Sequence, residues 1–149
     1  MNIKPSARTV IFDDNNLFAI IDVRNGEYFK IPGGGIEEGE TPFQAAIREA
    51  LEESGCEIKI IQKIGENKIV DESKNTIYHS ICYLAKKIQT IGFPSFDNWE
   101  KFNQMRVIWV DINQAIKLFR SATPKDSISS QINQRDLNFV LTAKEILNI

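Results

Sequence analysis

The sequence predicts a single α/β domain in which helices flank a mixed sheet. Short segments of alternating apolar residues come first, whereas apolar residues spaced three and four apart mark one helix in the middle and others late in the chain. This order is typical of a mixed sheet with helices packed against it. A chain of 149 residues can bury one hydrophobic core, so we expect one domain over residues 1–149.

The first half of the chain is expected to be mainly strands. Residues 7–12 and 17–23 predict two strands around a turn at residues 13–16, which contains only Asp and Asn. Residues 28–31 predict a short strand that ends at Pro32. The further expected strands are 57–64, 68–70, 76–86 and 104–110, with 68–70 paired to 76–86.

One helix is predicted over residues 42–54 from signals at both of its ends. Thr41 is a good N-cap, Pro42 suits the first helical position, and Gln44 completes the spacing of a capping box. Gly55 is expected to end the helix in a left-handed conformation. The predicted apolar stripe is Phe43, Ala46, Ile47, Ala50 and Leu51.

Two more helices are expected near the C-terminus. Asp111 is predicted to cap the first of them, which carries Ala115, Leu118 and Phe119. Residues 120–131 are polar and are predicted to form a loop. The last helix is indicated by a stripe of Leu137, Val140, Leu141 and Leu147.

Three acidic residues are predicted to share one face of the middle helix. At about 100° per residue, Glu49, Glu52 and Glu53 fall together, and we expect that face to lie roughly opposite the apolar stripe. Like charges on adjacent turns repel each other, and a divalent cation would convert that repulsion into binding. Mg²⁺ prefers carboxylate oxygens, so a magnesium site is predicted, with Mn²⁺ as a substitute. Arg48, four residues before Glu52 and eight after Glu40, is expected to hold the carboxylates in place.

An Arg-Glu-x-x-Glu-Glu run alone would favour a solvated acidic face instead, but the glycines, Glu40 and the helix signals in the same window favour a metal site. Residues 34–56 resemble the signature of the Nudix hydrolases, Gly-x5-Glu-x7-Arg-Glu-U-x-Glu-Glu-x-Gly-U, where U is usually bulky and aliphatic. The two U positions hold the smaller Ala50 and Cys56. The polar and glycine positions that match are Gly34, Glu40, Arg48, Glu49, Glu52, Glu53 and Gly55.

This resemblance covers 23 of 149 residues in the signature, and the flanking order of strands and helices extends it over nearly the whole chain. It implies an α/β/α sandwich and Mg²⁺-dependent cleavage of a phosphoanhydride bond in a nucleoside diphosphate linked to a group X. It also implies that Glu52 and Glu53 are the main metal ligands, joined by the Gly33 carbonyl. Glu49 is the next candidate, as ligand or base, with Arg48 as an orienting group.

The general base and the substrate contacts stay open at this stage. The base in this family is sometimes a signature glutamate, here Glu53 or Glu49, and sometimes an acid on a distant loop. Glu100 lies in such a loop, where an exposed acid without a catalytic role is the alternative. His79, the only histidine, is expected to be structural or part of a pocket wall.

Residues around the glycine run are the candidates for substrate binding. Gly34 and Gly35 would let the backbone approach a ligand, because no Cβ atom intrudes. Tyr28 or Phe29 could stack on a nucleobase, but strand alternation lets at most one of them reach a given pocket. Lys30 is a candidate for phosphate binding, and Arg8 is another; solvated surface positions are the alternative for both.

Composition excludes some classes of partner. The chain has 18 Lys+Arg against 20 Asp+Glu, so no basic excess supports binding to duplex nucleic acid, and a small nucleotide substrate is expected. Cys56 and Cys82 make no disulfide framework. No apolar segment predicts a signal peptide or membrane span, so we expect no membrane partner and a cytoplasmic location. A homodimer is left open.

Three subfamily marks are absent. Where the ADP-ribose type tends to have a proline, this chain has Asp71. Where the dinucleoside polyphosphate type tends to have a tyrosine, it has Glu72 and Ser73. No coenzyme A motif is found. These absences favour a nucleoside triphosphate pyrophosphohydrolase of the kind that sanitises damaged nucleotides. The alternatives are hydrolysis of ADP-ribose, a nucleotide sugar or a dinucleoside polyphosphate, and a non-catalytic nucleotide-binding regulatory module.

Overall fold

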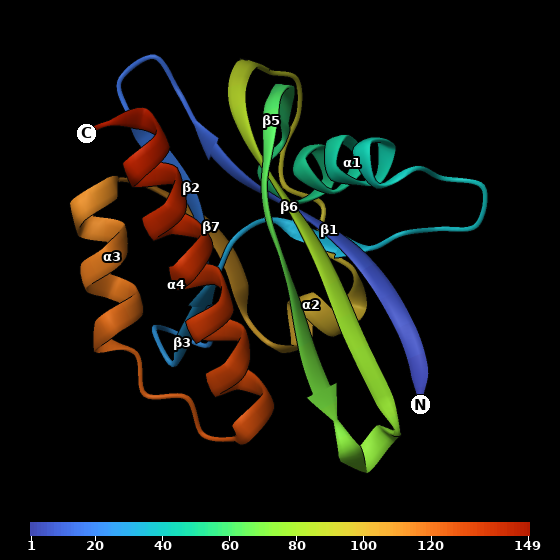
Figure 1. Ribbon diagram of the computed structural model, residues 1–149. Coiled ribbons are helices and arrows are strands. Elements are labelled where there is room, and N and C mark those ends of the chain that lie inside the picture. Colours follow the sequence, from blue (N-terminus) through green and yellow to red (C-terminus); the bar gives the residue numbers. More distant parts are fainter.

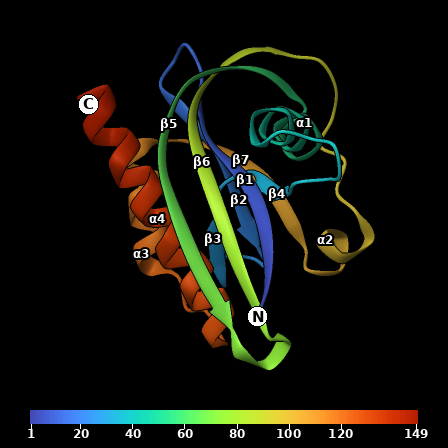
Figure 2. The same ribbon diagram turned by 45° about the vertical axis from the view of Figure 1, so that its right-hand side comes forward.

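The computed structural model describes residues 1–149 as a seven-stranded sheet with helices on both faces (Figures 1 and 2). The strand order is β3-β2-β1-β6-β5, and β4 pairs with β1 while β7 pairs with β2. Only β1 and β6 run parallel, so the sheet is mixed, as predicted. The strands are β1 (Asn2–Phe12), β2 (Leu17–Val23), β3 (Tyr28–Lys30), β4 (Gly33–Gly35), β5 (Cys56–Asp71), β6 (Thr76–Thr90) and β7 (Met105–Asp111).

The helices form the two outer layers of the sandwich. Figure 2 shows α1 on one side of the sheet and the neighbouring α3 and α4 on the other. None of the helices combines the length and the apolar character needed to span a bilayer. Their bounds are α1 (Pro42–Ser54), α2 (Asn98–Phe102), α3 (Ile112–Ser121) and α4 (Ser127–Leu147), and Glu72–Lys74 form a short 3-10 turn.

Alternation along β1 and β2 creates a separate core on each face of the sheet. Val10 and Phe18 pack with residues of α3 and α4 in the larger cluster. Ile11 and Ala19 point the other way and pack with Ala50 of α1. Adjacent residues of a strand project to opposite faces, so each strand contributes to both layers.

Several boundaries differ from the sequence-based expectation. Strand β1 begins at Asn2 rather than at residue 7, and the expected strands 57–64 and 68–70 are one irregular strand, β5. The predicted loop at 120–131 is wrong except at its centre, because α3 continues to Ser121 and α4 begins at Ser127. The early start of α4 follows from Asp126, whose side chain accepts a hydrogen bond from the Ser129 backbone.

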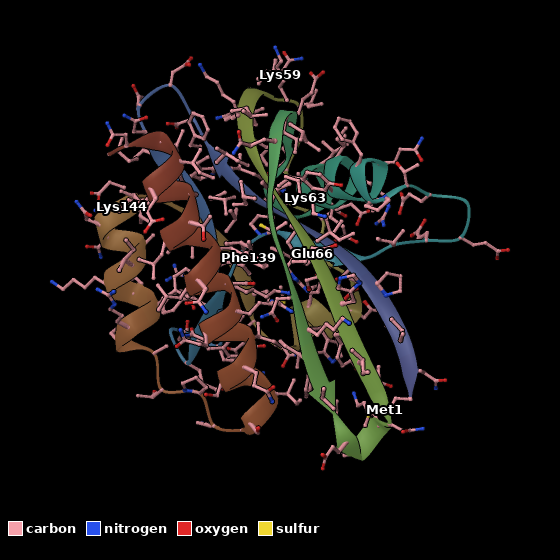
Figure 3. All side chains as sticks on the ribbon, viewed as in Figure 1. Met1, Lys59, Lys63, Glu66, Phe139 and Lys144 are labelled. Carbon is pink, nitrogen blue, oxygen red and sulfur yellow. The ribbon has the colours of Figure 1, made fainter.

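Helix α4 covers strand β3 with polar as well as apolar contacts. The Asn133 side chain accepts a hydrogen bond from the Phe29 backbone N–H at 2.9 Å, and Asp136 accepts one from Ile31 at 3.0 Å. Farther along the helix, Phe139 is buried between α4 and β5 (Figure 3). A Cβ atom on Gly65 of β5 would lie 3.1 Å from its ring, so a glycine there allows the helix to approach closely.

Candidate active site

Helix α1 begins and ends at the residues that the sequence predicts. Thr41 accepts a hydrogen bond from the Gln44 backbone at 3.1 Å, and the Gln44 side chain accepts one from the Thr41 backbone at 2.9 Å. Gly55 ends the helix with a φ of 72°, in the left-handed region. These caps fix the orientation of the helix that carries the signature glutamates.

The expected position of Glu53 opposite the apolar stripe is wrong. Its side chain is fully buried and lies on the sheet-facing side of α1, together with Ala46 and Ala50. Seven residues are nearly two turns, so Glu53 lies within about 20° of Ala46 around the axis. Phe43 and Leu51, which suggested a different buried face, are 48% and 41% exposed.

Only one of the two carboxylate oxygens of Glu53 is hydrogen-bonded to β4. Its Oε1 accepts a hydrogen bond from the Gly33 backbone N–H at 2.7 Å, whereas its Oε2 is buried without a partner. Burial raises the pKa of Glu53 to about 8, and the charge of Lys30 only partly opposes this. A buried carboxylate with a free oxygen is suited to bind a cation.

The glycine run forms strand β4. Gly33–Gly35 pair with β1, and none of the three has a positive φ. The close approach itself is present, because a Cβ on Gly33 would lie 2.6 Å from the Ala7 carbonyl oxygen. A Cβ on Gly34 would lie 2.6 Å from the carboxylate carbon of Glu49. The absence of side chains here lets β1, β4 and Glu49 pack together.

Arg48 links the other acidic residues of the signature. It donates two hydrogen bonds to Glu40, at 2.8 and 2.9 Å, and one to the Gly35 carbonyl at 2.9 Å. It also contacts Glu49 at 2.8 Å and Glu52 at 3.4 Å. These bonds lower the pKa of Glu40 to about 2, while burial raises the pKa of Glu49. The arrangement agrees with an orienting role for Arg48.

A cavity of about 660 Å³ lies beside these residues and is lined by side chains of both charges. The carboxylates are Glu49, Glu52, Asp71, Asp97 and Glu100, beside Gly33, Gly34 and Gly35. The cationic side chains that line the cavity are Lys4, Arg8, Lys30, Lys74 and Arg135.

The structure does not support substrate binding by Tyr28 or Phe29. Tyr28 is buried with Ile21 and Met105, and Phe29 packs on the other side against Phe119, with ring centroids 6.1 Å apart. Both side chains therefore belong to the core, in two separate clusters. Aromatic side chains do line the cavity, but they are Tyr78, Phe96 and Trp99.

Glu100 lies in the short helix α2 rather than in a loop. Its side chain accepts a hydrogen bond from the Asp97 backbone at 2.8 Å and so caps α2, and its charge raises the pKa of Glu53 and Glu49. The preceding segment is bound to α1, because the Ser95 N–H donates to the Glu52 carbonyl at 2.5 Å. Glu100 is thereby held close to the signature glutamates.

His79 lies outside the cavity. Its Nε2 is 3.5 Å from Oε1 of Glu66, and Figure 3 shows Glu66 on strand β5. This position agrees with the expectation of a structural residue.

The donor set suits a hard divalent cation. Mg²⁺ and Mn²⁺ take carboxylate and carbonyl oxygens. Glu49, Glu52 and Gly33 line the cavity, while the free Oε2 of Glu53 is buried beneath α1 and does not line it. The acidic side chains do not by themselves converge into a group of three around one point. Arg48 instead occupies the space between Glu49 and Glu52.

Sequence analysis named two of the cations that line the cavity, Lys30 and Arg8, but it missed Arg135. Arg135 lies about 80 residues beyond the signature, and its only local signal is an arginine next to the apolar stripe of α4. For Arg8 the alternative of a solvated surface position is wrong, because its Nη1 is buried without a partner and the residue lines the cavity. Neither position follows from a motif, since the sheet brings them together.

Comparisons with known proteins agree with this fold. The family model described as the NUDIX domain matches residues 3–132. Nudix hydrolase 4 of Arabidopsis thaliana is 24% identical over 118 residues, which are 79% of this chain and 55% of that protein. The chain therefore spans about half the length of this relative. An RNA pyrophosphohydrolase of Sulfurovum sp. (strain NBC37-1) is 60% identical over 35 residues, 24% of this chain and 21% of that protein.

A solved structure shows the same fold. The NUDIX hydrolase from Nitrosomonas europaea superimposes with a TM-score of 0.66 and 18% identity, over 92% of this chain and 89% of that one. Because the family model extends over most of the residues and includes the glutamates of α1, this chain belongs to the Nudix family.

Proposed function

We propose that this protein is a metal-dependent hydrolase that cleaves a phosphoanhydride bond in a nucleoside diphosphate linked to a group X. The observation that carries the proposal is the buried carboxylate of Glu53, whose Oε2 has no partner beside the Glu49 carboxylate and the β4 glycines. A buried ionised carboxylate is unfavourable unless it is paired or binds a metal. A cation at this point would complete the site.

The metal proposed is Mg²⁺, with Mn²⁺ as a substitute. Glu52, Glu53 and the Gly33 carbonyl are the proposed ligands, and Glu49 is a further one. When bound, the cation would supply positive charge to the phosphate oxygens and a more acidic water. Arg48 holds the Glu49 and Glu52 carboxylates in position through its ion pairs.

The proton of the attacking water needs a carboxylate acceptor. Glu53 is the first candidate from α1, provided that its Oε2 is free to accept the proton rather than bound to the cation. Glu49 is the second candidate from α1. Glu100 faces the same cavity and is the candidate from outside the signature, with one of its oxygens already used in the cap of α2.

The substrate that we favour is a nucleoside triphosphate, cut to a monophosphate and pyrophosphate. The absent subfamily marks at Asp71, Glu72 and Ser73 support this choice. ADP-ribose, nucleotide sugars and dinucleoside polyphosphates are the runner-up substrates. A triphosphorylated RNA 5′ end is a further candidate, because the Sulfurovum relative is named for that activity. A purely nucleotide-binding role is less favoured, since the signature carboxylates are all retained.

A substrate panel with Mg²⁺ tests the proposal. Nucleoside triphosphates, oxidised nucleotides, ADP-ribose, nucleotide sugars, dinucleoside polyphosphates and triphosphorylated RNA are compared by phosphate and pyrophosphate release. We expect pyrophosphate and a nucleoside monophosphate from triphosphates. Reaction in ¹⁸O-labelled water is expected to label the monophosphate, which reports attack at the inner phosphorus. Absence of metal-dependent cleavage of every substrate would reject the proposal.

A further inference from the structure

The short helix α2 carries two exposed aromatic side chains on one face. Trp99 and Phe102 are three residues apart, which places them about 60° from each other around the helix and makes them neighbours on its surface. Trp99 is 61% exposed and Phe102 is 85% exposed. Neither belongs to a hydrophobic cluster of the core, whereas Phe96, just before α2, packs against the cluster that contains Met105. Trp99 and Phe102 are called the α2 aromatic pair below.

The α2 aromatic pair continues outwards from the active-site cavity. Trp99 lines the cavity together with Glu100, but Phe102 does not. Because Trp99 is also largely exposed, it stands at the rim of the cavity. Figure 2 shows α2 at the edge of the molecule, away from the layer formed by α3 and α4. Single exposed apolar residues are common at protein surfaces, but two adjacent rings that extend a binding cavity offer a surface to a further part of the ligand.

We propose that the α2 aromatic pair stacks on a nucleobase downstream of the first nucleotide, so that the substrate is the triphosphorylated 5′ end of a single-stranded RNA, an inference that rests on the proposed function. Bases of single-stranded RNA stack on aromatic side chains with little regard to sequence, because every base has a π face. The exposed Lys101 of the same helix adds a positive charge for the phosphates of the chain. Water attacks the inner phosphorus as before, and the products are 5′-monophosphorylated RNA and pyrophosphate.

The position of Phe102 separates this substrate from a free nucleoside triphosphate. A free nucleotide has one base, and the aromatic side chains within the cavity, Tyr78 and Phe96, are available to it. A ligand that reaches Phe102 must continue beyond the first nucleoside. The balanced charge of the chain gives no support to duplex binding, but stacking of a single strand on aromatic rings contributes affinity that does not depend on a broad basic surface. Among the candidate substrates named above, the α2 aromatic pair therefore favours the RNA end.

The kinetic test compares GTP with a short 5′-triphosphorylated oligoribonucleotide that begins with the same nucleotide. We expect the wild type to have a lower KM for the oligonucleotide. Phe102→Ala should raise that KM about five- to a hundredfold and leave the KM for GTP unchanged. Phe93→Ala is the matched control and should change neither, because Phe93 is 92% exposed and does not line the cavity. Equal KM values for the two substrates in the wild type, or equal effects of the two variants, would overturn the inference.

A binding measurement without turnover separates this inference from the proposed function. The probes are GMP and the 5′-monophosphorylated oligoribonucleotide, which contain no phosphoanhydride bond, and both are titrated calorimetrically with Mg²⁺ present. Binding of the oligonucleotide that is tighter by about fivefold or more, lost in Phe102→Ala and kept in Phe93→Ala, supports the α2 aromatic pair even if no nucleotide is hydrolysed. Equal or undetectable binding of both probes by a wild type that hydrolyses nucleotides rejects the α2 aromatic pair alone.

Sedimentation of the wild type and Phe102→Ala tests a different occupant of the same face. Self-association of the wild type that Phe102→Ala abolishes would assign the α2 aromatic pair to a contact with a second copy of the chain and overturn the inference. We expect the two proteins to sediment alike.

Discussion

Gly34 and Glu49 are packed so closely that a Cβ atom on Gly34 would lie 2.6 Å from the Glu49 carboxylate carbon. The displaced group is the end of a flexible side chain, so Gly34→Ala is expected to fold. It should move the Glu49 carboxylate and lower turnover about ten- to a hundredfold, the range typical of changes around metal ligands. The matched control is Gly92→Ala, because a Cβ there meets no atom within 4 Å and Gly92 does not line the cavity. Equal activity of the two variants, measured by pyrophosphate release, would contradict a role for Glu49.

Replacement of Glu53 by glutamine is expected to abolish most of the hydrolysis. Glu53→Gln keeps the size and the oxygen that accepts from Gly33, but it removes the charge at the unpartnered position. Loss of a metal ligand or base should reduce kcat at least about a hundredfold. Turnover is measured at saturating Mg²⁺. A variant with near-normal turnover would show that the catalytic carboxylate lies elsewhere, and Glu100→Gln is then the next variant to measure.

Glu53→Gln is also expected to change how the free energy of unfolding of the metal-free protein depends on pH. Below pH 4.5 Glu53 is protonated in both states, but between pH 4.5 and about 8 only the unfolded chain releases the proton. The free energy of unfolding contributed by this group is therefore lost as the pH rises, by a few kcal/mol in all. Glu53→Gln should escape that loss and become the more stable protein towards pH 8.

Urea unfolding in EDTA across this pH range checks the prediction. The measured quantity is the difference in unfolding free energy between Glu53→Gln and the wild type. Glu38→Gln, at an exposed residue that forms no ion pair, is the control and should show no comparable trend. A difference for Glu53→Gln that stays constant with pH would show that its pKa is not raised in the fold.

Mg²⁺ is expected to stabilise the folded protein, because unfolding separates β4 from α1. At a hundred times its dissociation constant a bound ion adds about 2.7 kcal/mol, which corresponds to a rise in Tm of roughly 5–10 °C for a domain of this size. Thermal unfolding with Mg²⁺ and with EDTA measures the rise. The double variant Glu52→Gln/Glu53→Gln should lose it, whereas an equal response in both proteins would place the ion elsewhere.

Local signals were sufficient for the parts of the fold that depend on neighbours in sequence. The capping residues Thr41 and Gln44 and the terminal Gly55 predicted the bounds of α1 correctly, because each makes its contact within one turn. The burial of Glu53 was missed because Phe43 and Leu51 suggested a different inner face. A carboxylate beneath the helix goes against the hydrophobic pattern, so periodicity alone assigns it to solvent.

The remaining errors concern contacts between distant segments. Tyr28 was one of two candidates for stacking on a nucleobase, and its burial depends on Ile21, Val23 and Met105 of β2 and β7. Arg135 reaches the cavity because α4 packs on the sheet and brings Arg135 to Ser80 of β6. The pairing of Arg8 with Arg135 through Ser80 joins three segments, and no single-segment pattern predicts such a contact.

The cover that α4 forms over β3 has a consequence for association between chains. An edge strand with free N–H groups can add a strand from another molecule and so begin aggregation. On β3 the N–H of Phe29 is bound by Asn133, and the N–H of Ile31 just beyond it is bound by Asp136. The donors that a neighbouring chain would need are already used, so this edge is protected against intermolecular sheet extension. A homodimer that formed by sheet extension would have to use another edge.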